Sequence, residues 1–337
     1  MKAISCLEPG RLAMIDAPEP AASEDDVVVD VKRIGICGTD LHAYRGNQPF
    51  FAYPRILGHE LSGIVRSAGA RVEGLRPGDQ VAVMPYLHCG ECIACRRGKT
   101  NCCTRMQVLG VHVDGGMRER IAVSASHLIR TNGLTLDQSA VLEPLGIGAH
   151  AVRRSGLQAG DTVLVVGAGP IGLGVMAMAK RRGAAVIAMD INEERLSFCR
   201  SWARADACVN ALREPEQALL ELTNGEMPTV VFDATGSARS MEGAFRYPAH
   251  GGTLVFVGLV KSSIAFDDPE FHKRELTLMG SRNATKEDFD AVTEAIAAGD
   301  IDVSSFITHR ASFDDMIPQF ETWLKPESKT IKAMVEL

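Results

Sequence analysis

The pattern of apolar and polar positions changes near residue 150. Before it, short β-branched runs such as Val27–Val31 and Gln80–Val83 are interrupted by Gly and Pro, which is typical of short strands in a β-rich body. From Asp161 onward, strand-length apolar runs alternate with helical segments, and this alternation predicts a parallel, doubly wound sheet. The predicted elements of this second part are strands at Thr162–Val166, Ala185–Met189, Thr229–Phe232, Gly252–Val257 and Leu276–Met279, helices at Pro170–Arg182 and Lys286–Ala298, and a final strand at Lys332–Leu337.

Length and composition indicate a protein of two domains. A chain of 337 residues exceeds the size at which a single core stops growing, and 46% hydrophobic with 23% charged residues is ordinary for a globular protein. The net charge of -6 is spread along the chain, without the basic stripe of a nucleic-acid binder. The apolar runs are too short to span a bilayer, and the N-terminus lacks a signal peptide. We therefore predict a cytoplasmic protein without nucleic-acid or membrane partners.

A G-x-G-x-x-G pattern follows the first apolar strand of the second part and opens its helix. The glycines allow a tight turn, close approach of the backbone to a pyrophosphate and close helix–strand packing, although such a turn can also serve packing alone. Asp190 ends the next strand, where an acid would bind a ribose 2′-hydroxyl and repel a 2′-phosphate, which favours NAD over NADP. Arg195 can meet a phosphate or remain a solvated helix residue. The predicted cofactor residues are Gly167, Gly169, Pro170, Ile171, Gly172, Asp190 and Arg195.

Four cysteines crowd into one short segment, with Cys89, Cys92 and Cys95 followed by Cys103. In a chain without an export signal, an odd total of nine cysteines indicates metal binding rather than a disulfide framework. Four thiolates from one lobe can close a tetrahedron around zinc and leave no position for substrate, so this site is predicted to be structural. The neighbouring Cys102 is the one ambiguity, because adjacent side chains point apart.

A second set of metal-binding residue types is dispersed along the chain. Cys37 lies in Gly-Ile-Cys-Gly-Thr-Asp, His59 and Glu60 lie in Gly-His-Glu, and Glu143 lies in Leu-Glu-Pro-Leu. Taken singly, each has an ordinary explanation: a buried cysteine, a hydrogen-bonded histidine or a solvated glutamate. Residue type alone does not join them into one site.

These motifs, in this order, resemble the zinc-containing medium-chain dehydrogenase/reductase family over essentially the full length. The Asp114-Gly-Gly segment belongs to the same set, and Glu143 with the Gly-His-Glu motif favours the polyol (sorbitol) dehydrogenase branch. The resemblance implies an α/β protein with a GroES-like β-barrel catalytic domain from residues 1–150 and 285–337. A Rossmann NAD-binding domain would occupy residues 151–284.

The resemblance also implies roles for the dispersed residues. Cys37, His59 and a carboxylate, from Glu60 or Glu143, would hold a catalytic zinc, which lowers the pKa of a bound hydroxyl. Hydride would pass to the nicotinamide, while Thr39 and His42 relay the hydroxyl proton to solvent. Together with the four-cysteine lobe this implies two zinc ions per chain. The predicted catalytic residues are Cys37, Thr39, His42, His59, Glu60 and Glu143.

Several segments resemble the bacterial dehydrogenases that oxidise L-galactonate or L-gulonate at carbon 5. They predict a small sugar-acid substrate, whose carboxylate a guanidinium can hold bidentately. Sorbitol-like polyols, L-idonate, butanediol and L-threonine remain alternatives, as does a catalytically silent zinc-stabilised nucleotide-binding protein. The resemblance further suggests a homo-oligomer, either dimer or tetramer. The segments are Asn47–Arg55, Thr100–Cys103, Ala149–Arg154, Asp268–Lys273 and Met279–Thr285, and the predicted substrate residues are Arg282, Asn283, Phe50 and His112.

Overall fold

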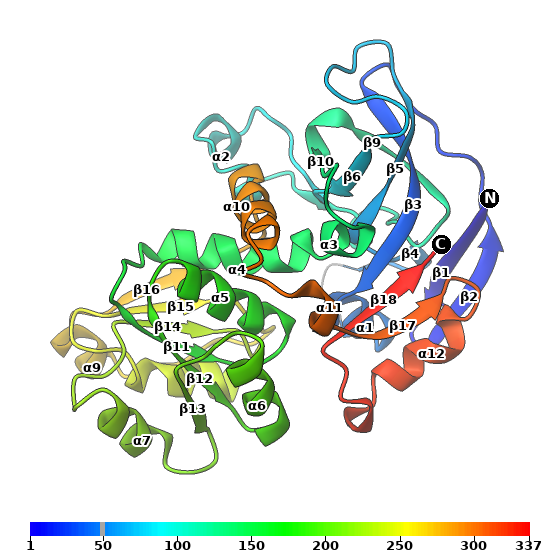
Figure 1. Ribbon diagram of the computed structural model, residues 1–337. Coiled ribbons are helices and arrows are strands. Elements are labelled where there is room, and N and C mark those ends of the chain that lie inside the picture. Colours follow the sequence, from blue (N-terminus) through cyan, green and yellow to red (C-terminus); the bar gives the residue numbers. More distant parts are fainter. Residues whose placement is uncertain (48–50) are drawn as a thin grey trace. The chain divides into compact units, whose positions relative to one another are not determined.

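The computed structural model describes residues 1–47 and 51–337, and the chain divides into two compact units (Figure 1). The first unit contains Met1–Glu143, Thr285–Thr293 and Val303–Leu337, and the second contains Pro144–Ala284 and Glu294–Asp302. Both ends of the chain therefore lie in the first unit. Two helices, α4 (Leu142–Ser155) and α10 (Lys286–Ala297), contribute residues to both units.

The first unit is built on a mostly antiparallel sheet in the order β10-β6-β5-β3-β18-β17, with β9 pairing β3. Along β3, alternate side chains are buried, as expected for a strand with one face on the core. Figure 1 shows the last strand, β18, beside β3, so the end of the chain pairs with its beginning. The strands are β3 (Asp26–Ile36), β5 (Glu60–Ala68), β6 (Gln80–Val83), β9 (Arg120–Ser124), β10 (Leu128–Arg130), β17 (Ile307–Ser312) and β18 (Lys332–Glu336).

Smaller sheets and short helices complete this unit. One sheet has the order β2-β1-β4, and a second pairs β7 with β8. The strands are β1 (Lys2–Glu8), β2 (Arg11–Asp16), β4 (Arg55–Ile56), β7 (Tyr86–Leu87) and β8 (Gln107–Val108). The helices are α1 (Gly38–Tyr44), α2 (Ile93–Arg96), η1 (Thr100–Cys102), η2 (Ala125–His127), α3 (Leu136–Ala140), α11 (Val303–Phe306), α12 (Met316–Trp323) and η4 (Pro326–Ser328).

The second unit contains a parallel sheet in the order β13-β12-β11-β14-β15-β16. Its central strand β11 is almost continuously apolar and buried, as a parallel strand covered on both faces requires. The predicted doubly wound parallel sheet is confirmed. Its strands are β11 (Thr162–Val166), β12 (Ala185–Asp190), β13 (Ala207–Asn210), β14 (Val230–Asp233), β15 (Thr253–Phe256) and β16 (Thr277–Gly280). Its helices are α5 (Pro170–Arg181), α6 (Glu193–Ser201), α7 (Pro215–Leu222), α8 (Ala238–Gly243), η3 (Ala244–Arg246) and α9 (Asp268–Lys273).

The pattern of apolar runs missed one strand of this sheet. The edge strand β13 has the sequence Ala-Cys-Val-Asn, and only Val209 is fully buried. A short edge strand that buries one side chain leaves too weak an apolar signal to predict. The other predicted strands differ from the observed ones mainly at their ends, as at Thr229–Phe232, where the observed strand is Val230–Asp233.

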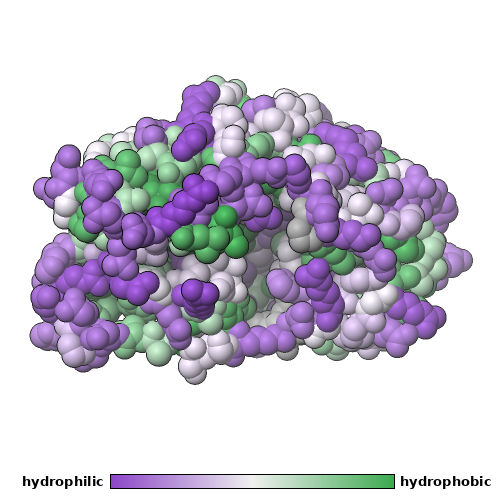
Figure 2. Space-filling model, turned by 90° about the horizontal axis from the view of Figure 1, so that it is seen from below, coloured by the Kyte–Doolittle hydropathy of each residue, from purple (hydrophilic) through white to green (hydrophobic). Residues whose placement is uncertain are grey.

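The surface mixes hydrophilic residues with scattered apolar ones. Figure 2 shows this on one face, where apolar residues form separate patches between hydrophilic side chains. Among the described residues, no helix is both long and apolar enough to cross a membrane.

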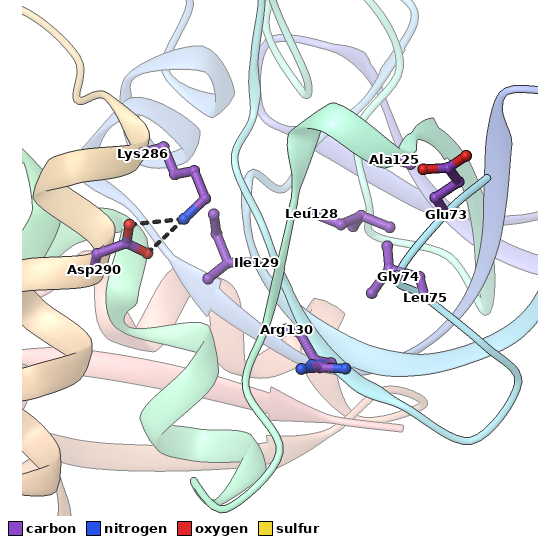
Figure 3. Close-up of a pocket in the computed structure, with 9 residues that line it drawn as sticks. All are labelled: Glu73, Gly74, Leu75, Ala125, Leu128, Ile129, Arg130, Lys286 and Asp290. Atoms are coloured by element: carbon purple, nitrogen blue, oxygen red, sulfur yellow. Dashed lines mark hydrogen bonds and ion pairs between the residues drawn. The ribbon is translucent and has the colours of Figure 1, made fainter.

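The first unit also has a cleft of about 370 Å³ (Figure 3). Lys286 and Asp290 of α10 form an ion pair of 2.7 Å on one side of it, while Arg130 and Ile129 come from β10. Its lining includes none of the residues predicted from sequence to bind metal, cofactor or substrate. The cleft therefore offers no support for any of those predicted roles.

His127 is a buried histidine beside the half-buried His88, with ring centroids 4.9 Å apart. Burial, together with the neighbouring His88, lowers the pKa of His127 to about 4. As the pH falls below about 6.5, the unfolded chain takes up this proton before the folded chain does. The contribution of His127 to stability is therefore complete above that pH and is lost as the pH falls toward 4.

When the pH falls from 7 to 5, proton uptake by His127 in the unfolded chain should by itself lower the free energy of unfolding by about 2 kcal/mol. Urea unfolding of the wild-type protein and the His127→Phe variant at both pH values measures this difference, because the other titrating groups are common to both. The variant should show the smaller loss of stability. Equal losses in the two proteins would contradict the assignment.

Candidate metal and cofactor sites

The four predicted lobe cysteines converge in the first unit. The Sγ atoms of Cys89, Cys92, Cys95 and Cys103 all lie within 4.8 Å of one another. Cys89 follows β7, Cys92 caps α2, Cys95 lies within α2, and Cys103 follows η1. Cys102 is exposed whereas Cys103 is buried, so the fold brings only the latter into the cluster. This is the donor set and arrangement of a closed tetrahedral zinc site.

Backbone amides already favour thiolates in part of this cluster. Hydrogen bonds from backbone N–H groups, chiefly the N–H of Cys95, lower the pKa of Cys92 to about 5. The backbone N–H of Glu91 is the main cause that lowers the pKa of Cys89 to about 7. Burial raises the pKa of Cys95 to about 12. Four sulfurs this close cannot all be ionised without a cation between them, and zinc supplies that charge while displacing the thiol protons. The residues therefore fit a structural zinc ion.

A second group of donors gathers at one end of the main sheet. Cys37 directly follows β3 and caps α1, while His59 directly precedes β5. Because β3 and β5 are antiparallel and Gly35 pairs with Glu60, the end of one strand meets the start of the other. Donor atoms of Cys37, His59 and Glu60 lie within 4.8 Å of one another.

Asp40 fixes the two segments that carry these donors. Its buried carboxylate accepts the backbone N–H of Cys37 at 2.9 Å and that of Gly58 at 3.3 Å. Its Oδ1 atom also lies 3.8 Å from Nδ1 of His59. One carboxylate therefore holds both turns and lies beside the imidazole, whose Nδ1 makes no hydrogen bond to the described residues.

Glu60 is held by a lysine that the sequence reading missed. Nζ of Lys332 lies 2.6 and 2.7 Å from the two carboxylate oxygens of Glu60 and donates to the carbonyl of Ile36 at 3.2 Å. The strand order β5-β3-β18 places β3 between them, so the carboxylate crosses β3 over Gly35. A Cβ atom on Gly35 would lie 2.1 Å from Oε2 of Glu60, and only glycine leaves that path open. The one available signal was a lysine directly before an apolar run, in the strand Lys-Ala-Met-Val-Glu.

Glu143 lies outside the group of three donors but within reach of its charges. Glu143 lies in the first turn of α4, is buried, and accepts a hydrogen bond from the hydroxyl of Tyr86. Burial raises the pKa of Glu143 to about 7, and the charge of Glu60 adds to this increase. Two carboxylates thus share one buried region, each with its own partner: Lys332 for Glu60 and Tyr86 for Glu143. The sequence reading missed Tyr86 as well as Lys332.

The site as a whole favours a bound cation. Burial by itself lowers the pKa of His59, but Cys37, Asp40 and Glu143 together raise it well above its usual range. The same negative surroundings that favour a proton on His59 attract a divalent metal, whose binding displaces that proton. Sulfur, imidazole nitrogen and carboxylate oxygen are zinc ligands, and three protein donors leave a position for substrate. The residues fit a catalytic zinc ion.

Thr39 and His42 lie on α1, immediately after Cys37. Their spacing of three places them side by side on the helix surface. Thr39 is half-buried and His42 is exposed, so the pair leads from partial burial to solvent. This arrangement is compatible with the predicted proton relay, which stays a prediction.

The glycine pattern forms a tight turn between β11 and α5 in the second unit. A Cβ atom on Gly172 would lie 1.8 Å from the carbonyl oxygen of Gly167, so the helix can approach the turn only with glycine there. Gly169 caps α5 without a side chain, which leaves the first N–H groups of the helix available to an anion. Pro170 and Ile171 form the start of that helix, both half-buried.

Asp190 and Arg195 lie next to this turn. One carboxylate oxygen of Asp190 accepts the backbone N–H of Ala168 at 2.7 Å, and the other accepts that of Asn192 at 2.9 Å. Asp190, at the end of β12, therefore holds the glycine turn through Ala168 and its own turn through Asn192. Each carboxylate oxygen keeps a second lone pair for a ribose hydroxyl. Nη1 of Arg195 comes within 4.0 Å of the position that a Cβ atom on Gly169 would occupy. Arg195 thus lies beside the turn, where a phosphate would bind.

The predicted substrate residues are not brought into one described cluster. Arg282 and Asn283 follow β16 in the second unit, with Asn283 in the left-handed region at φ 54°. His112 lies in the first unit, and its Nδ1 accepts the backbone N–H of Val108 at 3.0 Å. Phe50 lies outside the described residues. The substrate roles of these four residues stay predictions.

The matches to family models follow the same division of the chain. Residues 23–133 match the alcohol dehydrogenase GroES-like domain, and residues 170–298 match the zinc-binding dehydrogenase domain. With the full-length relatives described next, these matches place the chain in the zinc-containing medium-chain dehydrogenase/reductase family. The predicted fold class, a GroES-like domain with a Rossmann domain, is confirmed, as is the prediction of a zinc-dependent, NAD-binding alcohol or polyol dehydrogenase.

Its relatives include dehydrogenases of sugar acids. The L-galactonate-5-dehydrogenase of Escherichia coli K12 is 40% identical over 335 residues, covering 99% of this chain and 98% of that protein. The 2-dehydro-3-deoxy-L-galactonate 5-dehydrogenase of Pseudoalteromonas atlantica is 33% identical over 319 residues, covering 94% and 93%. The crystal structure of RspB from Escherichia coli CFT073, described as a short chain alcohol dehydrogenase complexed with NADH, is 31% identical with a TM-score of 0.93, covering 100% of this chain and 99% of that one.

Replacing Lys332 with methionine should destabilise the protein strongly. The change leaves the carboxylate of Glu60 buried without its cation, a loss worth about 3–5 kcal/mol. Urea unfolding of the zinc-loaded variants measures it. Lys180→Met is the matched control, because Lys180 pairs with Asp206 at 2.9 Å on the surface, where the expected loss is about 1 kcal/mol or less.

Removing both partners tests the cause of that loss. The double variant Lys332→Met with Glu60→Gln should recover part of the stability, because no charge is then left buried alone. Equal losses for Lys332→Met and Lys180→Met would show that the ion pair does not hold this end of the sheet.

Proposed function

We propose that this protein oxidises a secondary alcohol of a sugar acid of the L-galactonate or L-gulonate type, transferring hydride to NAD and giving a keto-aldonate. The observation that carries the substrate proposal is the 40% identity, over nearly the full length of both chains, to an L-galactonate-5-dehydrogenase. A second relative is named for the oxidation of a deoxy sugar acid at the same carbon. The buried Cys37, His59 and Glu60 group supports the zinc chemistry.

In this proposal Cys37, His59 and one of the two carboxylates, Glu60 or Glu143, hold the catalytic zinc. When bound, zinc lowers the pKa of a substrate hydroxyl and so makes its proton easier to remove. Asp40 holds the two turns that carry Cys37 and His59. The two carboxylates are held in place by Lys332 and Tyr86, respectively.

The chain's other predicted residues complete the reaction scheme. Thr39 accepts the hydroxyl proton, and His42, which is exposed on the same helix, passes it to solvent. Asp190 selects NAD over NADP by repelling a 2′-phosphate. Arg282 and Asn283 receive the substrate carboxylate. Residues 1–150 and 285–337 act as the catalytic domain and residues 151–284 as the cofactor domain, in a cytoplasmic homo-oligomer.

Initial rates of NADH formation on a matched substrate panel test the substrate. We expect L-galactonate or L-gulonate to exceed sorbitol, xylitol, butanediol and L-threonine by orders of magnitude in kcat/KM, with NAD exceeding NADP. A chelator should abolish the rate, and Arg282→Ala should raise KM for the sugar acid. If neutral polyols or threonine give the highest rates, the sugar-acid assignment is wrong, whereas chelator-sensitive oxidation of any alcohol keeps the zinc assignment.

Zinc content distinguishes the ligand cysteine from its neighbour. We expect two zinc ions per chain in the wild-type protein, one for each donor group. Cys103→Ser should reduce this to one, because a tetrahedral site of four thiolates loses a ligand, while Cys102→Ser should leave both. Metal analysis after dialysis measures the content. Zinc loss in Cys102→Ser with retention in Cys103→Ser would reverse the assignment.

A further inference from the structure

The phenol of Tyr86 lies among the buried charged groups of the metal site. Tyr86 lies on β7 and donates its hydroxyl hydrogen to Oε1 of Glu143. Both residues are buried, with Tyr86 3% exposed and Glu143 5% exposed. The charges of Cys37 and Glu60 act on Tyr86, and those of His59 and Glu60 act on Glu143. The pair therefore belongs to the same buried region as the three donors.

The backbone of Tyr86 is itself fixed on both sides. Tyr86 pairs with Val108 of β8, and β7 leads within three residues to Cys89 of the four-cysteine lobe. A zinc-closed lobe would therefore anchor the strand that carries the phenol. The hydroxyl has a defined position from which to hold a carboxylate, whereas a free glutamate side chain would sample several rotamers.

We propose that Tyr86 is a positioning residue for Glu143 at the proposed catalytic zinc, an inference that rests on the proposed function. A carboxylate can offer a metal one oxygen or both. By taking one lone pair of Oε1 and fixing the side-chain rotamer, the phenol restricts Glu143 to binding through a single oxygen, whether it reaches the metal directly or through water. That restriction keeps a coordination position open for the substrate hydroxyl, which a bidentate glutamate would occupy.

Tyr86→Phe removes the hydroxyl oxygen and keeps the ring. In the cobalt-substituted protein, the visible ligand-field bands report coordination number, and they weaken as a four-coordinate site gains ligands. We expect the variant to lose band intensity and kcat to fall by about tenfold, the loss for one hydrogen bond to a charged group. The Tyr86→His variant, which restores a donor, should recover part of both.

A second buried tyrosine supplies the matched control. Tyr44 donates to Oε1 of Glu321 at 2.6 Å, and Glu321 lies on α12, outside the metal-binding group. Tyr44→Phe therefore removes a tyrosine–glutamate hydrogen bond to the exposed Glu321, away from the metal site, and should leave the cobalt bands unchanged. If both variants lose only stability and neither changes the bands, Tyr86 is a structural residue and the positioning role is wrong.

A further experiment tests whether Tyr86 acts on the metal site through Glu143. In a Glu143→Gln background, Tyr86→Phe should cause no further change in the cobalt bands, and additive changes would overturn the proposal. If Tyr86→Phe does not fold, Glu143→Asp withdraws the carboxylate from the phenol by one methylene and should give the same loss of band intensity. Failure of the wild-type protein to bind a metal at Cys37 and His59, or chelator-insensitive oxidation, would instead refute the proposed function.

Discussion

The buried ion pair between Lys332 and Glu60 is the contact on which the metal-binding end of the first unit depends. Removing two charges from water is costly, and only close geometry with further hydrogen bonds offsets the cost. Here both carboxylate oxygens contact the ammonium group, which also bonds the carbonyl of Ile36. The pair ties β18 to β3 and β5. Cys37 follows the end of β3 and His59 precedes the start of β5, so the two donors meet at this end of the sheet. Gly35 makes the contact possible because it alone leaves the carboxylate room to cross β3.

Glu60 and Glu143, two of the three buried carboxyl groups at this end, are distinguished by their partners. Glu60 lies against the ammonium group of Lys332, whereas Glu143 lies against the phenol of Tyr86, and burial raises the pKa of Glu143 to about 7. The same residue type thus has two electrostatic environments within one cluster. A bound divalent metal would complete the charge balance of a region that contains a thiol, an imidazole, an ammonium group and three carboxyl groups. This balance explains why so many ionisable groups can be buried together.

The cofactor turn in the second unit depends on local chemistry instead. Its glycines, helix start and Asp190 lie within one strand–helix–strand segment, and backbone hydrogen bonds to Asp190 hold the turn in shape. Because all of these parts are close in sequence, the pattern of residues predicted their arrangement, including the parallel sheet. The edge strand β13 escaped prediction for the opposite reason, since it buries one side chain and its pairing is decided by the neighbouring strand β12.

The sequence by itself determined what is local: the four-cysteine lobe, the glycine turn and the doubly wound sheet. Those features follow from spacing and residue type over short stretches. Through motif resemblance the sequence also predicted the donors Cys37, His59 and Glu60, which the fold brings together. Only the tertiary structure decided which partner Glu60 and Glu143 each have, because Lys332 and Tyr86 reach them from elements far apart in the chain. The packing of those elements sets such contacts, and a lone lysine or tyrosine carries no periodic signal of its partner. The tertiary structure also decided that Cys103, and not Cys102, joins the lobe. The two residues are of the same type, and the direction of each side chain makes the difference.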